Sequence, residues 1–201
     1  MNTSVDALWL ATLQKISAHV AHDLKGALNG VSVNLEVVRS RSQKESSTGA
    51  DVHRYATNAA DQMAVVIRAT TALLALARGT RGPVEVSMVA KQLANLLDDM
   101  SSTSTGRIQV LVDGGMSAET AAPMSLVRLA VAECLLAAVA GKEAISVRVA
   151  GLPTPRVLIT PALAPVLAAN VEAAFWAAGI QVSTDGHGIS ISLPGPPELP
   201  H

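Results

Sequence analysis

The sequence predicts two parts in series: an α-helical hairpin that forms a dimeric four-helix bundle, and an α+β sandwich behind it. Apolar residues recur every three or four positions through residues 4–43 and again through residues 51–77, which is the spacing of amphipathic helices. Beyond residue 84, short β-branched runs alternate with apolar helical segments. Of the 201 residues, 49% are apolar and only 2% are aromatic, so the core must be aliphatic, as suits helix bundles and small α/β layers.

The first helix is expected from residue 4 to about residue 43. Ser4 can cap its start, but Ala7 stands at the third helical position, so the capping box is incomplete. Residues 42–50 are polar and contain a glycine, which predicts a loop. The apolar stripe of the helix consists of Leu13, Ile16, Val20, Leu24, Ala27, Val31, Leu35 and Val38.

A second helix is expected over residues 51–77, before a break at 78–83 that contains two glycines and a proline. Two helices joined by a short loop pack as an antiparallel hairpin, and their apolar stripes leave one face uncovered. A second copy related by a two-fold axis would cover that face, so residues 1–79 are predicted to be a dimerisation domain. The stripe of the second helix consists of Tyr55, Ala59, Met63, Val66, Thr70, Leu73 and Ala77.

Residues 84–194 are predicted to form the α+β sandwich, a mixed sheet with helices on one face, and residues 195–201 a loose, Pro-rich tail. Helices are expected at 84–100 after a short lead, at 123–140 and at 161–178. The last two strands flank Asp185-Gly186-His187-Gly188, which is typical of a hairpin turn. β-branched content predicts strands at 107–113, 144–150, 156–160, 180–183 and 189–193.

Composition excludes several classes of function. The net charge of −1 offers no basic surplus for nucleic acid. No apolar run reaches the ~20 residues that a membrane-spanning helix requires, and the N-terminus has no signal-peptide pattern. The single cysteine, Cys134, lies in an apolar run, which predicts a buried thiol in a reducing compartment. We therefore expect a cytoplasmic protein that binds neither nucleic acid nor membrane.

His22 is the residue that packing does not explain. Val20 and Leu24 belong to the apolar stripe and lie two positions to either side, each about 200° around the helix, so His22 faces outward. An exposed histidine is by itself more often an ordinary surface residue. His19, one turn away, adds too few ligands for a metal site.

The neighbours of His22 favour phosphate chemistry, because imidazole can carry a phosphoryl group at neutral pH. Asp23 can hold the proton on one ring nitrogen and leave the other nucleophilic, and Lys25 can meet phosphate oxygens. Gly26 lies one turn beyond His22, where glycine costs about 1 kcal/mol relative to alanine and leaves room for a docking protein. Asn29, two turns beyond, extends this polar strip.

Residues 16–38 resemble the H-box of sensor histidine kinases, in which a phospho-accepting histidine is followed by an acidic residue, Leu, a basic or polar residue and Pro-Leu. His22, Asp23, Leu24 and Lys25 match that motif, whereas Ala27 stands where the family usually has proline. The two helices and their loop extend the resemblance over residues 1–79. In this family the acidic residue is the base for phosphoryl transfer, a role that the resemblance gives to Asp23.

Residues 84–194 are similar in length and element order to the ATP-binding domain that follows the hairpin in these kinases. The nucleotide motifs are missing, because Ala137 stands at the place of a magnesium-binding asparagine. Residues 158–163 occupy the place of the Asp-x-Gly-x-Gly box without an acid or a glycine. The resemblance therefore implies a degenerate ATPase-like domain that binds no ATP, and a chain with no cofactor or metal of its own.

A retained histidine beside a lost ATP site resembles the dimeric bacterial histidine phosphotransferases of the ChpT kind. The resemblance implies that His22 relays a phosphoryl group between aspartates of response-regulator receiver domains in a two-component phosphorelay, with Mg²⁺ supplied by the receiver. Asp23 would orient His22, and Lys25, Gly26 and Asn29 would contact the receiver. Three alternatives remain open: a non-catalytic dimeric scaffold or regulator of a two-component system, a divergent active histidine kinase, and an ordinary helical dimer.

Overall fold

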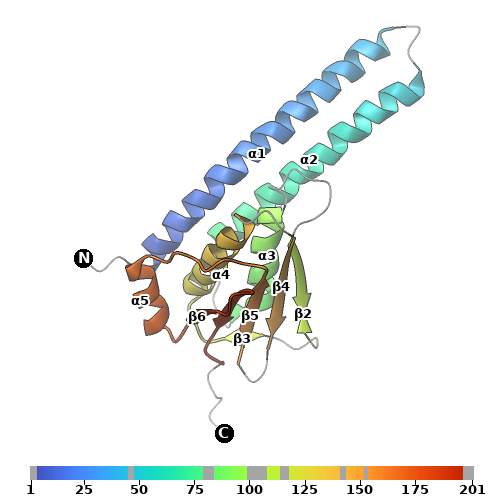
Figure 1. Ribbon diagram of the computed structural model, residues 1–201. Helices are drawn as coiled ribbons and strands as arrows, with labels where there is room; N and C mark the ends of the chain where they lie inside the picture. Colours follow the sequence, from blue (N-terminus) through green and yellow to red (C-terminus); the bar gives the residue numbers. More distant parts are fainter. Residues whose placement is uncertain are drawn as a thin grey trace.

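The computed structural model describes residues 4–44, 48–78, 84–98, 108–113, 118–140, 144–151 and 154–196. Two long helices, α1 (Val5–Ser42) and α2 (Gly49–Ala77), pack as an antiparallel hairpin, as predicted. Figure 1 shows the hairpin rising from an α/β layer, with the N-terminus at its foot and its tip far from the layer. Part of the predicted loop, residues 45–47, lies outside the described residues.

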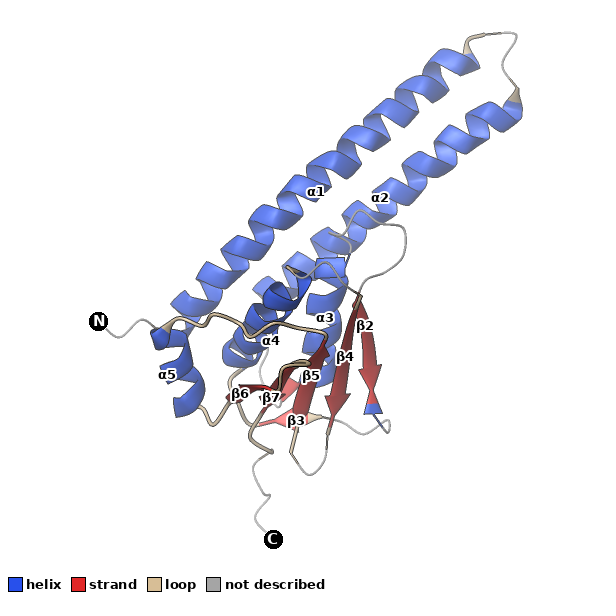
Figure 2. Ribbon diagram, viewed as in Figure 1, coloured by secondary structure: helices blue, strands red, loops and turns tan. Residues whose placement is uncertain are grey.

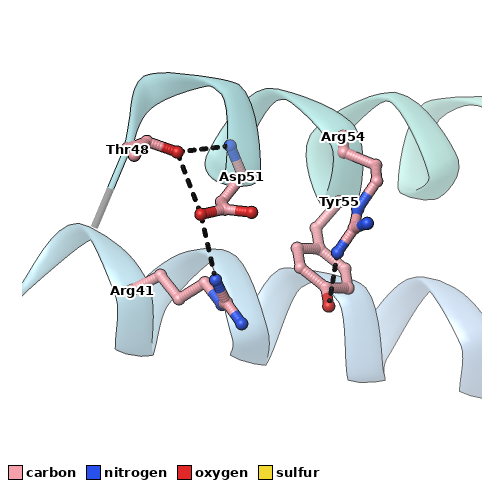
Figure 3. A network of polar contacts seen from close by, with 5 residues as sticks. All are labelled: Arg41, Thr48, Asp51, Arg54 and Tyr55. Atoms are coloured by element: carbon pink, nitrogen blue, oxygen red, sulfur yellow. Dashed lines mark hydrogen bonds and ion pairs between the residues drawn. The ribbon is translucent and has the colours of Figure 1, made fainter. Parts of the chain in front are cut away.

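Side-chain caps begin both helices of the hairpin. Ser4 Oγ accepts a hydrogen bond from the Ala7 N–H at 3.2 Å, which confirms the predicted cap of α1. Thr48 caps α2 in the same way through the Asp51 N–H, at 3.3 Å. At the tip, Arg41 of α1 lies 3.3 Å from the Asp51 carboxylate, to which Thr48 also donates (Figure 3). The ion pair between Arg41 and Asp51 joins the two helices where the chain reverses, and Thr48 holds the Asp51 carboxylate in place.

The α/β layer contains one main sheet with the strand order β2-β4-β5-β7-β6. β2 and β4 are parallel and the other neighbours are antiparallel, so the predicted mixed sheet is confirmed (Figure 2). β1 and β3 form a separate two-stranded sheet, which the sequence did not indicate because two residues carry no period. The elements are β1 (Val84–Glu85), α3 (Val86–Asp98), β2 (Ile108–Val112), β3 (Glu119–Thr120), α4 (Met124–Val139), β4 (Ile145–Ala150), β5 (Arg156–Thr160), α5 (Ala169–Ala177), β6 (Gln181–Thr184) and β7 (Ile189–Ser192).

Helices α3 and α4 cover one face of the main sheet (Figure 2). The strands show this arrangement in their alternation of burial: in β4, Ile145, Val147 and Val149 are buried, whereas Arg148 is exposed. The largest fully buried side chains are leucine, isoleucine and valine, so the core is aliphatic, as expected from the composition. The second part of the chain is thus an α+β layer with one helical face.

The predicted helix over residues 161–178 is wrong in its first half. α5 begins at Ala169, and residues 161–168 form a strap without helical structure (Figure 1). Pro161 and Pro165 have no N–H to donate, and each disfavours helical backbone in the residue before it. The strap leaves Leu163 72% exposed and Val166 98% exposed.

The buried face of α2 matches the predicted stripe only in part: Ala59 is buried and Leu73 packs against the core, as predicted. Ala69 and Leu76 are buried, whereas Met63 of the predicted stripe is exposed, together with Ile67 and Leu74. Because α2 is apolar around much of its circumference, its periodicity does not select a single stripe. A second apolar stripe therefore faces away from α1.

The foot of the hairpin and the α/β layer share one hydrophobic core. Ile16 and Val20 of α1 and Leu76 of α2 belong to the same cluster of buried residues as the side chains of α3, α4 and the sheet. Most of the expected break, residues 79–83, lies outside the described residues. So do residues 99–100 of the predicted third helix, residue 107 of the predicted strand and residues 197–201 of the tail.

Among the described residues, one helix is long and apolar enough to cross a membrane by length and composition, namely α2. Length and composition alone are weak evidence for a membrane span. Only 17% of the most apolar window of α2 is buried within the chain. This helix therefore carries more apolar surface than one chain covers.

Candidate functional site

His22 lies in α1 between two residues that face the core. Val20 is buried and Leu24 is half-buried against the same cluster. The helical period turns His22 outward, as predicted, and its side chain is 90% exposed. A protein approaching from solvent can therefore reach the imidazole ring.

Asp23 holds the ring of His22. Asp23 Oδ1 lies 3.1 Å from His22 Nδ1, which is a hydrogen-bonding distance. When Nδ1 carries the proton it donates to this carboxylate, and Nε2 keeps its lone pair for nucleophilic attack. The carboxylate also stabilises the positive charge that the ring gains when Nε2 forms a bond.

Gly26, Asn29 and Val33 follow His22 at helical spacing, and these four residues form one exposed line along α1, here called the His22 strip. A Cβ added at Gly26 would meet nothing within 4 Å, so the strip has low relief there. Asn29 is exposed on this side of the helix, and so is Lys25, one turn before it. Val33 is 63% exposed and was missed by sequence reasoning, although its spacing from His22 could have revealed it.

Two contacts join α1 to α4 on the N-terminal side of the His22 strip. Thr12 Oγ1 donates to Glu133 Oε1 at 2.6 Å, and Lys15 Nζ lies 3.6 Å from the same oxygen. Lys15 precedes His22 by two helical turns and so lies on the same side of α1. Sequence reasoning missed these contacts, because 121 residues separate Thr12 from Glu133. The sequence offered one signal for them, namely Glu133, an acidic residue within the apolar run of α4.

The turn around His187 is a hairpin turn, as the sequence predicts. It connects β6 to β7, which pair as antiparallel neighbours. Asp185 Oδ1 accepts hydrogen bonds from the backbone N–H groups of His187, at 3.0 Å, and Gly188, at 2.9 Å. These two hydrogen bonds lower the pKa of Asp185. Gly186 serves the turn with a φ of +81°, whereas Gly188 lies where a Cβ would collide with the Ile159 carbonyl oxygen.

Cys134 is buried in α4, as expected. Burial, with the neighbouring charge of Glu133, raises the pKa of its thiol to about 12. The thiol therefore stays protonated and unreactive at neutral pH.

Among the residues that the structure describes, no group of three or more His, Cys, Asp or Glu side chains is placed to hold a metal ion. No model of a known protein family matches the chain, and no curated protein matches it either.

Proposed function

We propose that this protein is a histidine phosphotransferase of a two-component phosphorelay, which passes a phosphoryl group between receiver aspartates through His22 and uses no ATP. The observation that carries the proposal is an exposed imidazole whose Nδ1 is held by Asp23, 3.1 Å away. By the resemblance to histidine kinases, Ala137 and residues 158–163 stand where such a kinase needs a magnesium ligand and an acidic glycine box. A histidine equipped to accept phosphate thus lacks a nucleotide donor of its own, so another protein must supply the phosphoryl group.

Transfer would occur by two displacements at phosphorus. The lone pair of His22 Nε2 attacks the acyl phosphate of a receiver, the P–O bond breaks, and the receiver aspartate leaves as a carboxylate. The proton on Nδ1 stays in place, and Asp23 meets the positive charge of the phosphorylated ring. In the second displacement a receiver carboxylate attacks, the P–N bond breaks, and its electron pair returns to Nε2. Lys25 offers a cation to the phosphoryl oxygens beside the Mg²⁺ that the receiver brings.

The receiver would dock on the His22 strip. Gly26 leaves room for its backbone or side chains, and Asn29 offers hydrogen bonds from an exposed amide. Val33 presents an apolar contact at the far end of the strip. A partner with an apolar side chain set about 16 Å from its reacting carboxylate fits this line, given the rise of an α-helix.

The proposal includes a homodimer built by the hairpins. Met63, Ile67 and Leu74 form an exposed stripe on α2, and Leu28 and Leu35 form another on α1. Going around each helix in the direction of the chain, the exposed stripe follows the buried face. Because the two helices run in opposite directions, the two stripes lie on the same side of the hairpin. A second copy covering that side would complete a four-helix bundle.

Dimerisation would leave the His22 strip open. Leu28 follows His22 by six positions, which is about 120° around the helix, so the two side chains point in different directions. The dimer would act in the cytoplasm on receiver domains, with neither nucleic acid nor membrane as a partner.

Capture of a phosphoryl group tests the proposal. A receiver is radiolabelled with a small acyl phosphate, freed of excess donor and mixed with this chain. We expect an acid-labile label on the wild-type chain and none on His22→Ala. The matched control is His53→Ala, which removes an exposed histidine of α2 and should label like the wild type.

Two outcomes would overturn the proposal. Label acquired from ATP alone, in a preparation free of other kinases, would identify a divergent histidine kinase. No label from any receiver of a broad panel would favour a scaffold or regulator in which His22 is unused.

A further inference from the structure

The junction between the hairpin and the α/β layer is packed as a core. Ile16, Val20 and Leu76 of the hairpin are at most 1% exposed. They belong to the same cluster as Leu93 of α3 and Leu129 of α4, both fully buried. Separation of the two parts would return all these aliphatic side chains to water, which the hydrophobic effect opposes.

Arg128 of α4 binds the C-terminal end of α2. Arg128 is only 4% exposed, and its guanidinium donates hydrogen bonds to three backbone carbonyls. Nη1 donates to Leu76 O at 2.9 Å and to Arg78 O at 2.8 Å, and Nη2 donates to Ala75 O at 3.2 Å. α2 has no basic residue in its own last turn, so α4 supplies the cation that the end of a helix favours.

Glu133, also in α4, connects this helix to α1. Its side chain is 17% exposed and accepts the hydrogen bond from Thr12 at 2.6 Å, with Lys15 Nζ 3.6 Å away. Arg128 and Glu133 are five positions apart, which is about 140° around α4. α4 therefore holds α2 with one side and α1 with another.

We propose that the hairpin and the α/β layer move as one rigid body. Arg128 and Glu133 make the polar contacts that connect the two parts. The layer then keeps a fixed place against the foot of α1, beside Lys15, and does not travel along α1 toward His22. A protein that docks at His22 meets a preformed surface, so no free energy is spent on ordering the two parts. The rigid connection between the two parts does not depend on whether His22 accepts phosphate.

Distances between spin labels on the whole chain test the proposal. Ser40→Cys on α1 and Gln109→Cys on β2 place one nitroxide on each part at exposed positions. Cys134 is buried and unreactive, so it stays unlabelled. Doubly labelled chains are diluted with excess unlabelled chain, so that only distances within one chain contribute. We expect a single narrow distance distribution.

Arg128→Met should lose that single narrow peak, because the last carbonyls of α2 lose their donor. Arg148→Met, which removes an exposed arginine 3.6 Å from Asp113, is the matched control and should keep the peak. Should Arg128→Met fail to fold, Glu133→Leu takes its place with the same expected broadening. Two results would overturn the proposal. One is a broad or two-peaked distribution in the doubly labelled chain that keeps both Arg128 and Glu133. The other is a narrow peak that Arg128→Met, or Glu133→Leu in its place, leaves unchanged.

Discussion

At the scale of single residues, the pair His22 and Asp23 is built by one helix alone. The two residues are neighbours in the sequence, so their distance of 3.1 Å needs no tertiary contact. Both side chains are open to water, which weakens the attraction between exposed charges. Asp23 is therefore expected to act mainly by orienting the ring and by meeting the charge that develops during transfer.

Replacement of Asp23 by asparagine separates these two roles. The asparagine Oδ1 still accepts a hydrogen bond from Nδ1–H, but it cannot offset the positive charge of the phosphorylated ring. We expect the rate of phosphoryl capture from a receiver to fall by about two orders of magnitude, with unchanged thermal stability. Asp61→Asn, which alters an exposed carboxylate of α2, should keep the wild-type rate. An unchanged rate in Asp23→Asn would remove Asp23 from the site.

Gly26 is expected to serve docking at the expense of helix stability. Gly26→Ala should stabilise the protein by up to ~1 kcal/mol, because the added methyl group meets no atom within 4 Å. The same variant should slow transfer, because the methyl group fills space that we assign to the receiver. Thermal denaturation and the rate of capture measure the two effects.

Gly30→Ala provides the contrast to Gly26→Ala. A Cβ at Gly30 would collide with the side chain of Gln62, which must move, so the gain in stability should be smaller. If Gly26→Ala stabilises the helix but transfers at the wild-type rate, Gly26 has no part in docking.

At the scale of elements, the start of α3 is held by a carboxylate. Glu85 accepts hydrogen bonds from the N–H groups of Ser87 at 3.2 Å, Met88 at 2.8 Å and Ala118 at 3.4 Å, and from the Ser87 hydroxyl. Burial works to raise the pKa of Glu85, but these hydrogen bonds together outweigh it and lower the pKa below its ordinary value. A depressed pKa in the folded state contributes stability above the ordinary pKa, and this contribution is lost as the pH falls through the folded value.

Glu85→Gln should therefore lower the free energy of unfolding at neutral pH by about 1–2 kcal/mol, the usual effect of losing a helix cap. The difference from the wild type should shrink below the ordinary pKa of 4.5, where the wild-type carboxyl also becomes protonated. Chemical denaturation of both proteins at neutral and acid pH measures this. Glu172→Gln, at an exposed position of α5, should show no such pattern. A difference that is constant with pH would refute the role of the Glu85 charge.

The elements of this chain could be predicted where a local period defines them. Ser4 and the unbroken stripe of α1 predicted that helix, and His22 with Asp23 could be found because they are adjacent. The strap at residues 161–168 was missed, because its apolar composition resembles a helix while its prolines prevent one. The contacts of α4 with the hairpin could not be predicted, since Arg128 and Leu76 are 52 residues apart and no local pattern encodes such a pair.

At the scale of the whole molecule, one side of the hairpin places apolar side chains in water. Ile67 and Leu74 of α2 are 60% and 55% exposed, and a second hairpin would cover them. Ile67→Glu should convert the proposed dimer to a monomer, as measured by sedimentation or light scattering. Leu163→Glu, at an exposed apolar position of the strap, is the control and should remain dimeric. A wild-type chain that sediments as a monomer would contradict the proposed bundle.

The central claim is that His22 carries phosphate from one receiver to another. The most direct measurement mixes a radiolabelled phosphoreceiver, a second unlabelled receiver of different size and this chain, without ATP. We predict that label appears on the second receiver with the wild-type chain and not with a folded, dimeric His22→Ala variant. Label that reaches the second receiver equally well with His22→Ala would contradict the account.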